Sequence, residues 1–268
     1  MKSSRFLYIM LLFAAGAILN YVYADVVVVG DLSHEKTAQP GEIYTGEIIL
    51  QNFGEEPEQV RVYQEDYIFF ADGSGHYPEP GTIDRSNSSW ITFSPKQVYI
   101  VPEEKSIVHY KVEVPEADTL TGTFWSMLII EPLREIVPES TEGIKIHTVM
   151  RYGIQMITHI GGTGIRDIQF SGTKLIREED KLFLQVDIKN VGERMLVPKV
   201  WAELYDESGN LIGPFESGLK KTYPGTSIRK KIDISTASSG NYKAMIIADC
   251  GEDDLFGIQY DIKIDVIK

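Results

Sequence analysis

The chain has 268 residues, and its 26 Lys and Arg against 39 Asp and Glu give a formal net charge of −13 at pH 7. This acidity disfavours binding to nucleic acid or to anionic membrane surfaces, so we expect neither partner. Cys250 is the only cysteine, which excludes an internal disulfide and leaves stability to the hydrophobic cores.

Residues 1–24 have the pattern of a secretory signal peptide. Lys2 and Arg5 form a basic start, residues 6–19 an apolar stretch, and residues 22–24 (Val-Tyr-Ala) a cleavage site. An uncleaved anchor is the alternative, but the stretch is shorter than the roughly 20 residues that span a bilayer. We predict a mature chain without a membrane span, with 24 basic against 39 acidic residues.

Short strands separated by turns are predicted next. Residues 25–30, 42–52 and 60–70 are rich in β-branched and alternating apolar residues, and residues 71–89 form a Gly, Pro and Ser-rich loop. Residues 87–89 (Asn-Ser-Ser) match an N-glycosylation sequon by pattern. No helical periodicity interrupts this part of the chain.

Residues 90–131 contain three further apolar runs at the spacing typical of a β-sandwich. In the third run Phe124 and Leu128 share one face of a strand, while Trp125, Met127 and Ile129 share the other. A strand that is apolar on both faces is expected to be covered on both sides.

Residues 144–160 predict one strand of unusual length, roughly 53 Å against a usual ~17–20 Å. Its apolar face is predicted to continue the surface of the preceding strand, as a groove beside an unpaired backbone edge that a partner strand occupies. The alternative is that the second domain or the first domain's own core covers this face. The predicted partner-binding residues are Trp125, Met127, Ile129, Ile144, Ile146, Met150, Arg151, Tyr152, Ile154 and Met156.

Two sequence motifs recur in the same order and indicate a duplicated sandwich. Residues 122–131 (GTFWSMLIIE) return as residues 240–249 (GNYKAMIIAD), and residues 52–55 (NFGE) return as residues 190–193 (NVGE). Residues 161–164 (GGTG) read as the linker, because no helix pattern follows them. We therefore predict an all-β chain of two immunoglobulin-like β-sandwich domains in tandem, residues 25–161 and 166–268, after the signal peptide.

The first domain resembles the N-terminal, immunoglobulin-like domain of PapD-like periplasmic pilus-assembly chaperones. The resemblance rests on residues 94–105 (SPKQVYIVPEEK) and residues 123–132 (TFWSMLIIEP), the latter similar to that family's FWLNV-x-x-IP strand. The two-domain plan is also similar to that of exported WxL-interacting surface proteins. The resemblance implies a protein that pairs strands with a secreted partner.

Pilus chaperones hold the subunit's terminal carboxylate with an Arg near the first strand and a Lys on the long strand. This chain has His34 and Lys36 in the first-strand region, and Arg151 on the long strand. The resemblance therefore implies Arg151 as a carboxylate anchor, and a solubilising charge at a strand edge is the alternative.

Other chemistry has little support in the sequence. The five histidines lack metal-ligand spacing, and no nucleophile elbow or phosphate loop is present. Residues 249–254 are a dense acidic cluster, for which weak Ca²⁺ binding is less favoured than a solvated loop. We expect no cofactor, no metal and no enzymatic activity.

These observations predict an exported, periplasmic or cell-envelope protein of a chaperone-like, assembly or adaptor type. Its partner is expected to be a secreted or envelope protein bound by β-strand addition at the long strand. The alternative is a structural or adhesive envelope protein that displays loops on two sandwiches.

Overall fold

The computed structural model describes residues 25–133 and 150–265, in which the regular elements are β-strands and one short 3₁₀ helix, η1 (Ser88–Trp90). The predicted signal peptide and the predicted strand residues 144–149 lie outside these described residues. Within the described ranges, no helix is long and apolar enough to cross a membrane.

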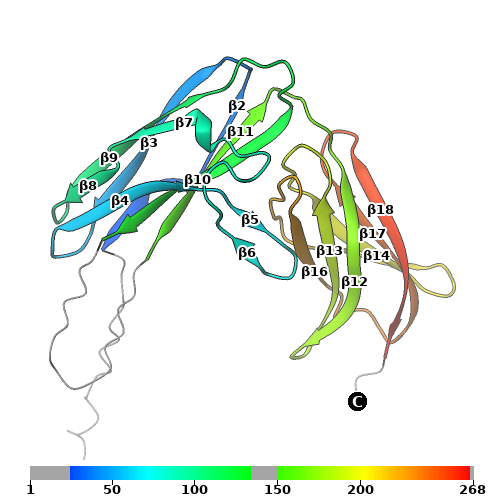
Figure 1. Cartoon of the computed structure of the whole chain (residues 1–268). Coiled ribbons are helices and arrows are strands. Elements are labelled where there is room, and N and C mark those ends of the chain that lie inside the picture. Colours follow the sequence, from blue (N-terminus) through cyan, green and yellow to red (C-terminus); the bar gives the residue numbers. More distant parts are fainter. Residues whose placement is uncertain (1–24, 134–149, 266–268) are drawn as a thin grey trace, which may run out of the picture.

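The first domain is a sandwich of two facing sheets (Figure 1). Its strands are β1 (Val26–Val29), β2 (Ser33–Ala38), β3 (Ile43–Asn52), β4 (Glu58–Glu65), β7 (Ile91–Ser94), β8 (Gln97–Ile100), β9 (Lys105–Glu113), β10 (Gly122–Pro132) and β11 (Tyr152–Ile160). The sheets have the orders β1-β3-β9-β7 and β2-β11-β10-β4-β8. The first segment contributes a strand to each sheet, and the remaining order is that of an immunoglobulin sandwich.

The second domain repeats this plan. Its strands are β12 (Ile168–Glu178), β13 (Lys181–Asn190), β14 (Lys199–Tyr205), β15 (Leu211–Glu216), β16 (Ser227–Asp233), β17 (Gly240–Asp249) and β18 (Leu255–Ile264). The sheets have the orders β12-β13-β16 and β15-β14-β17-β18. The prediction of two immunoglobulin-like β-sandwiches is confirmed.

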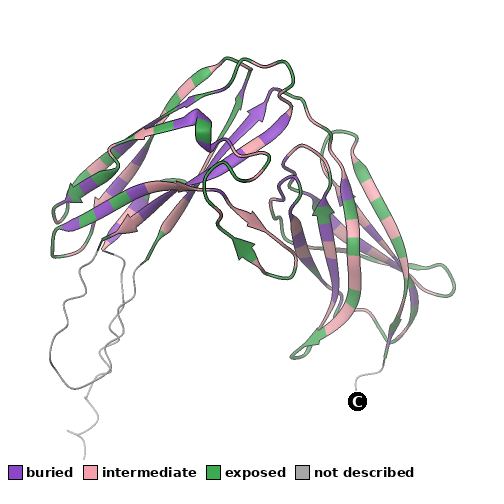
Figure 2. Ribbon diagram, in the orientation of Figure 1, coloured by how far each residue is buried: buried purple, intermediate pink, exposed green. Residues whose placement is uncertain are grey.

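Each sandwich has its own apolar core, because alternate side chains of both sheets point inward. Leu50 and Val108 lie in the first core, and Leu184 and Ile246 in the second; all four are inaccessible to solvent. Figure 2 shows this alternation of buried and accessible residues along the strands. Among the described strands, none of the first domain belongs to a sheet of the second domain.

The recurring sequence motifs occupy equivalent positions. β10 and β17 are both central strands, and Asn52 and Asn190 both end the strand before the next corner. Each asparagine is buried; Asn52 Nδ2 donates to the carbonyls of Glu56 and Ile100, and Asn190 Nδ2 donates to those of Arg194 and Thr222. The same corner is thus built twice, with a side-chain amide that bonds two carbonyls in addition to the strand pairing of each asparagine.

The segment after β4 departs from the predicted single strand over residues 60–70. Asp66 is buried and interrupts it: its carboxylate accepts hydrogen bonds from the backbone of Thr82 and Ile83 and from Ser86 Oγ. The chain resumes as a small hairpin of β5 (Ile68–Phe69) and β6 (Gly75–His76). This hairpin projects from the first domain toward the second (Figure 1).

Candidate functional site

The register between β10 and β11 divides the predicted partner-binding residues between two faces of one sheet. Met127 pairs with Gln155 and Ile129 with Gly153, whereas Leu128 pairs with Ile154. Residues paired in an antiparallel ladder lie on the same face, so Met127 and Ile129 are on the opposite face from Ile154. The predicted continuous apolar surface across both strands is therefore wrong.

The apolar face of β11 belongs to the first domain's core. Ile154 and Met156 are 0% and 2% exposed and pack among the core residues, and Tyr152 packs against the same cluster. The alternative stated for this face, that the domain's own core covers it, holds for these residues. Ile144 and Ile146 lie outside the described residues.

The second domain covers one end of the opposite face. Trp125 is 2% exposed and stacks on Tyr223, with ring centroids 4.8 Å apart and ring planes at 29°. The Trp125 indole N–H donates to the carbonyl of Tyr67, 2.8 Å away. Such an aromatic pair contributes about 0.5–1.5 kcal/mol beyond its area burial. Trp125 is thus part of the interface between the domains.

A hydrogen-bonded chain accompanies this stack. The Tyr223 hydroxyl donates to Gln155 Oε1 (2.9 Å), and Gln155 Nε2 donates to the Tyr67 hydroxyl (3.2 Å). Burial raises the pKa of Tyr67 to about 12, and burial likewise raises the pKa of Tyr223. Both phenols therefore stay neutral under physiological conditions and hold the two domains together.

A second, ionic link joins the domains beside the first. His159 is buried; its Nε2 donates to Glu35 Oε1 (2.9 Å), and Lys221 Nζ lies 3.0 Å from Glu35 Oε2. Thr123 Oγ1 accepts the backbone N–H of Met195 and lies 2.8 Å from His159 Nδ1. Because the Glu35 carboxylate takes the proton on Nε2, Nδ1 of the neutral ring accepts the Thr123 hydroxyl proton. This network selects the neutral histidine with its proton on Nε2.

The pKa directions agree with this assignment. Burial lowers the pKa of His159, and the bond to Glu35 offsets this only in part. Burial raises the pKa of Glu35, but its bonds from Lys221 and His159 outweigh burial and lower that pKa overall. A neutral histidine beside a carboxylate and an ammonium group is the stable state.

At the beginning of β11, the pairing with β2 stops. β2 pairs with β11 in parallel only from Gln155 to Ile160, so this ladder does not reach Tyr152, Gly153 or Ile154. Gln155 donates its N–H to Leu32 O on that side (2.9 Å), and alternation along the strand points the Gly153 N–H in the same direction. Among the described residues no strand pairs with the edge beside Gly153, which therefore offers backbone groups for pairing.

Two predicted residues stand next to this edge. Met150 is 48% exposed, and Arg151 Nη1 lies 3.1 Å from the Tyr63 hydroxyl and 3.7 Å from Glu65 Oε1. Glu65 Oε2 is buried without a hydrogen-bond partner in the part of the chain that the structure describes. Arg151 thus already faces one carboxylate and remains partly accessible.

The other carboxylate-anchor candidates, His34 and Lys36, lie elsewhere. They occupy β2 and pair with Met156 and Thr158, farther along β11 than Arg151. His34 Nδ1 is hydrogen-bonded to the Tyr110 hydroxyl at 2.8 Å. The structure therefore does not bring these residues together with Arg151 as one basic site.

Two other sequence candidates have structural roles. Asn87, the sequon residue, is buried, and its Nδ2 donates to Met156 O (3.0 Å). In the acidic loop Glu252 and Asp254 both form ion pairs with Arg166. No group of three or more His, Cys, Asp or Glu able to hold a metal occurs among the described residues.

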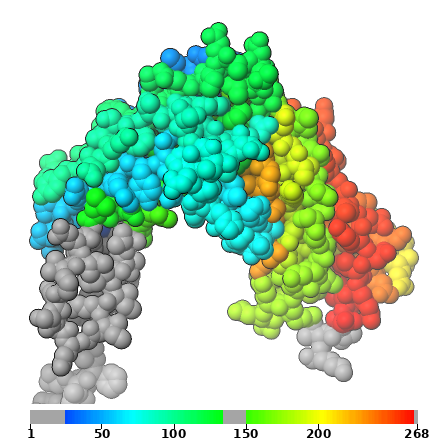
Figure 3. Space-filling model, in the orientation of Figure 1, coloured from blue at the N-terminus to red at the C-terminus, as the bar shows by residue number. Residues whose placement is uncertain are grey.

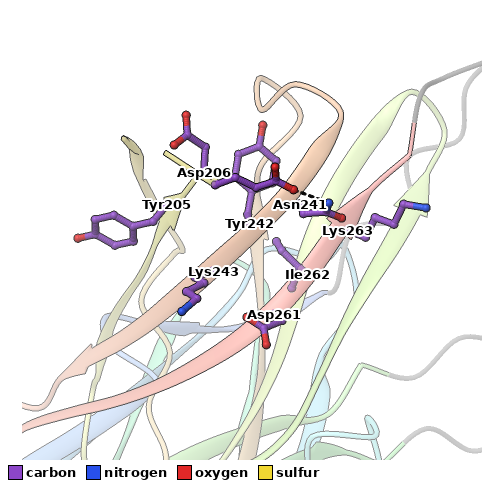
Figure 4. Close-up of a pocket in the computed structure, with 9 residues that line it drawn as sticks. Tyr205, Asp206, Asn241, Tyr242, Lys243, Asp261, Ile262 and Lys263 are labelled. Carbon is purple, nitrogen blue, oxygen red and sulfur yellow. Dashed lines mark hydrogen bonds between the residues drawn. The ribbon is translucent and has the colours of Figure 1, made fainter. Parts of the chain in front are cut away.

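The second domain carries a surface hollow of about 410 Å³ between the ends of β14, β17 and β18 (Figure 4). Tyr205, Lys243 and Asp261 line it, and Asn241 Nδ2 donates to Glu207 Oε1 at its rim. Both acidic and basic side chains line the hollow, so neither positive nor negative charge dominates there. The hollow is suited to a packing contact rather than to an ionic ligand.

One repeat was missed in the sequence. Residues 152–155 (Tyr-Gly-Ile-Gln) return as residues 256–259 (Phe-Gly-Ile-Gln), and both follow the duplicated central strand. The register makes the match structural, because Met245 pairs with Gln259 and Ile247 with Gly257, as Met127 and Ile129 pair with Gln155 and Gly153. An alignment of the two halves beyond the first motif could have found it.

No protein-family model matches the chain, and no curated protein matches it. One similar solved structure is from a chaperone–tip adhesin complex of CFA/I fimbriae, with a TM-score of 0.48 and 10% identity over 89% of this chain and 98% of that chain. A second is from the CsuC–CsuE chaperone–tip adhesion subunit complex of Acinetobacter baumannii, with a TM-score of 0.44 and 16% identity over 88% of this chain and 98% of that chain. A third is the class 5 fimbriae chaperone CfaA, with a TM-score of 0.43 and 10% identity over 90% of this chain and 100% of that chain. The assignment of the fold stands on the strand order given above.

Proposed function

We propose that the chain is an exported, periplasmic or envelope-associated protein that binds a secreted protein partner by β-strand addition. The binding edge runs from Met150, two residues before β11, to Ile154 in β11, and it replaces the longer surface predicted from the sequence. A chaperone, assembly or adaptor role of this kind is what the sequence resemblance to PapD-like chaperones implies.

The observation that carries the proposal is the end of the β2 ladder at Gln155. On the other side β10 pairs with β11 as far as Tyr152, so the strand is held extended while one edge lacks β2. Main-chain groups presented in this way are a template for another strand. Met150 adds an accessible apolar side chain and Arg151 a cation at the same place.

Three edge strands of the second domain carry features that oppose pairing. β12 has a bulge between Phe170 and Gly172, and β15 has Pro214 and an irregular register with β14. β16 presents Arg229 and Lys231. Bulges, proline and charge are the usual means of protecting a sheet edge. The edge beside Gly153 has neither a bulge nor a proline, and its one nearby charge, Arg151, faces Glu65.

A photoactivatable residue at position 150 tests the proposal in the native envelope. We expect a cross-link to a secreted protein, identified by mass spectrometry. Arg151→Ala in the same chain, or an excess of the unmodified chain as competitor, is expected to reduce the cross-link, whereas a Met150→Asp competitor is expected to reduce it less. The matched control is position 43, where Ile43 is 58% exposed on β3. Equal cross-linking at both positions contradicts strand addition at β11.

The display alternative has its own outcome in the same experiment. Position 209, in the turn between β14 and β15, lies at a loop of the second domain. If cross-links form there and not at position 150, the loops contact the partner, and a structural or adhesive role is the better description.

A further inference from the structure

The outer face of the sheet β15-β14-β17-β18 carries apolar side chains that the second core does not use. Ile247 pairs with Trp201 on one side and with Gly257 on the other, and Met245 lies one row along the same face. Trp201, Met245 and Ile247 are half-buried, while the inward residues between them are buried. Figure 2 shows this alternation along the strands of the second domain.

The first domain has the same arrangement in a covered form. Met127 and Ile129 are the counterparts of Met245 and Ile247 in the duplicated strand, and they are 8% and 2% exposed. In the second domain the same types of side chain, with the same glycine beside the isoleucine, remain accessible. A duplicated apolar face that is buried in one copy and only half-buried in the other indicates a place for a partner.

The charges along β17 indicate which partner fits. Its outward side chains run Lys243, Met245, Ile247 and Asp249, with a cation at one end, an anion at the other and two apolar residues between them. Two such strands stacked in opposite directions put each lysine over an aspartate and each methionine over an isoleucine. The pattern is self-complementary, as an isologous two-fold contact requires.

Neighbouring features fit the same arrangement. Leu255 is 63% exposed and pairs with Asp249, at the opposite end of the face from the hollow beside Lys243 (Figure 4). Antiparallel stacking brings this protruding leucine toward the hollow of the other copy. Glu203, in the middle of the face, already accepts hydrogen bonds from the Tyr205 hydroxyl (2.7 Å) and the Trp201 indole (3.3 Å).

We propose that this surface, the β17 face (Trp201, Lys243, Met245, Ile247, Asp249, Leu255), binds the β17 face of a second copy of the chain. The two-fold axis lies midway between the two sheets, perpendicular to β17 and level with the point between Met245 and Ile247, and the sheets pack face to face about 10 Å apart. The contact lies in the second domain, away from the β11 edge, so it neither uses nor blocks the proposed strand-addition site.

Sedimentation velocity on the full chain over a range of concentrations tests the dimer. We expect Ile247→Lys to shift the chain to monomer, because it places an ammonium group in the centre of the contact. The matched control, Ile107→Lys, changes an isoleucine that is 40% exposed on β9 of the first domain, and the dimer is expected to persist. A chain that stays monomeric, or a dimer indifferent to Ile247→Lys, overturns the proposal.

A charge-exchange experiment tests the register itself. Lys243→Asp creates two Asp–Asp contacts in its own homodimer, and Asp249→Lys creates two Lys–Lys contacts, so each variant is expected to weaken the dimer at least about tenfold. Mixing the two variants restores both opposite-charge contacts in the mixed dimer. Thermal unfolding of each variant shows that it is folded. If the folded variants do not recover association on mixing, the proposed register is overturned.

Discussion

Asn52 and Asn190 show how one residue type can fix a corner of a sandwich. Each is buried, and each closes a turn by accepting the backbone N–H of a glycine two residues on, Gly54 or Gly192. Each side chain also satisfies two carbonyls on separate segments, which no apolar residue of similar size can do. Removing the amide leaves those buried carbonyls without a donor.

We therefore expect Asn52→Ala and Asn190→Ala each to lower the free energy of unfolding by about 1–3 kcal/mol or more. Hydrogen exchange followed by mass spectrometry should place the loss of protection in the domain that carries the substitution. Asn210→Ala, in an exposed turn, is the control, and its effect is expected to stay within about 0.5 kcal/mol. Comparable losses in all three variants would contradict this role.

His159 makes the contact between the domains sensitive to acid. Its pKa is lowered mainly by burial from an ordinary value of 6.5. Below about pH 6.5 the unfolded chain takes up a proton that the native histidine does not, so the free energy of unfolding falls as the pH falls toward the native pKa. The lowered pKa of Glu35 acts in the same direction, but only below its ordinary value of 4.5.

Urea unfolding between pH 7.5 and 5 should isolate the histidine contribution. We expect His159→Gln to reduce the dependence of the free energy of unfolding on pH in this range. His109→Gln, at a histidine whose side chain is 65% exposed, is the control for loss of a histidine. A pH dependence that is unchanged in His159→Gln, or reduced equally in the control, would show that the interdomain network does not titrate.

At the scale of single strands, alternation in the sequence predicted β10 and β11 but not their mutual register. Both faces of β10 are apolar, so the sequence alone does not decide which of them lies on the same side of the sheet as the apolar face of β11. Ile154 and Met156 were correctly placed on one side of a strand, but that side belongs to the core. The partner site that we propose keeps to the strand predicted from the sequence, whereas its proposed extent depends on where β2 stops pairing.

The interruption at Asp66 was missed for a related reason. Residues 60–70 have the composition of one strand, and the carboxylate that breaks it acts on residues 82–86, well along the chain. A sequence shows local propensity, while this turn depends on a contact between distant segments. The two-domain plan was more predictable, because two motifs in the same order are less sensitive to such contacts.

Gly153 and Gly257 form a natural matched pair within the two central hairpins. A Cβ added to Gly153 would lie 1.9 Å from Met127 Cε, whereas at Gly257 the nearest atom, Ile246 O, would be 3.8 Å away. We expect Gly153→Ala to lower the free energy of unfolding by about 1–3 kcal/mol, because Met127 must move in a packed site. We expect Gly257→Ala to have little effect.

Thermal and urea unfolding of both variants measure this difference. Combining Gly153→Ala with Met127→Ala should give less than the sum of the two losses, since the methyl group of Met127 is no longer in the way. Equal effects at the two glycines would contradict the close approach of Met127 to Gly153.

At the scale of the whole molecule, the two sandwiches are joined by contacts of the β5–β6 hairpin, Tyr223 and the linker residues 161–166. We call this junction the elbow. The hairpin β5–β6 of the first domain lies against the second domain, as Figure 3 shows, and Phe69 packs against the second core. The linker is held as well: Arg194 Nη1 donates to the carbonyls of Gly161 (3.1 Å) and Thr163 (2.9 Å). A linker bonded in this way is expected to resist proteases in the native chain.

Tyr223→Ala should loosen the elbow, because it removes both the stack on Trp125 and the hydrogen bond to Gln155. We expect faster cleavage within residues 161–166 in limited proteolysis and a larger radius of gyration in solution scattering. Tyr99→Ala, at a side chain 68% exposed in the first domain, is the control. If the Tyr223→Ala chain is cleaved no faster than the control, the elbow is held by other contacts.

The position of Tyr223 in the chain means that the contacts between the domains form late during synthesis. Trp125 and Ile157 belong to a domain whose last strand ends at Ile160, yet the tyrosine that packs with them emerges only after β15. During synthesis or export from the N-terminus, the first sandwich can close while this apolar patch is still uncovered. Glu35 likewise lacks its ion pair until Lys221 is made, because Lys221 follows it by most of the length of the chain. Until Tyr223 and Lys221 have been made, the nascent protein exposes this patch to wrong contacts.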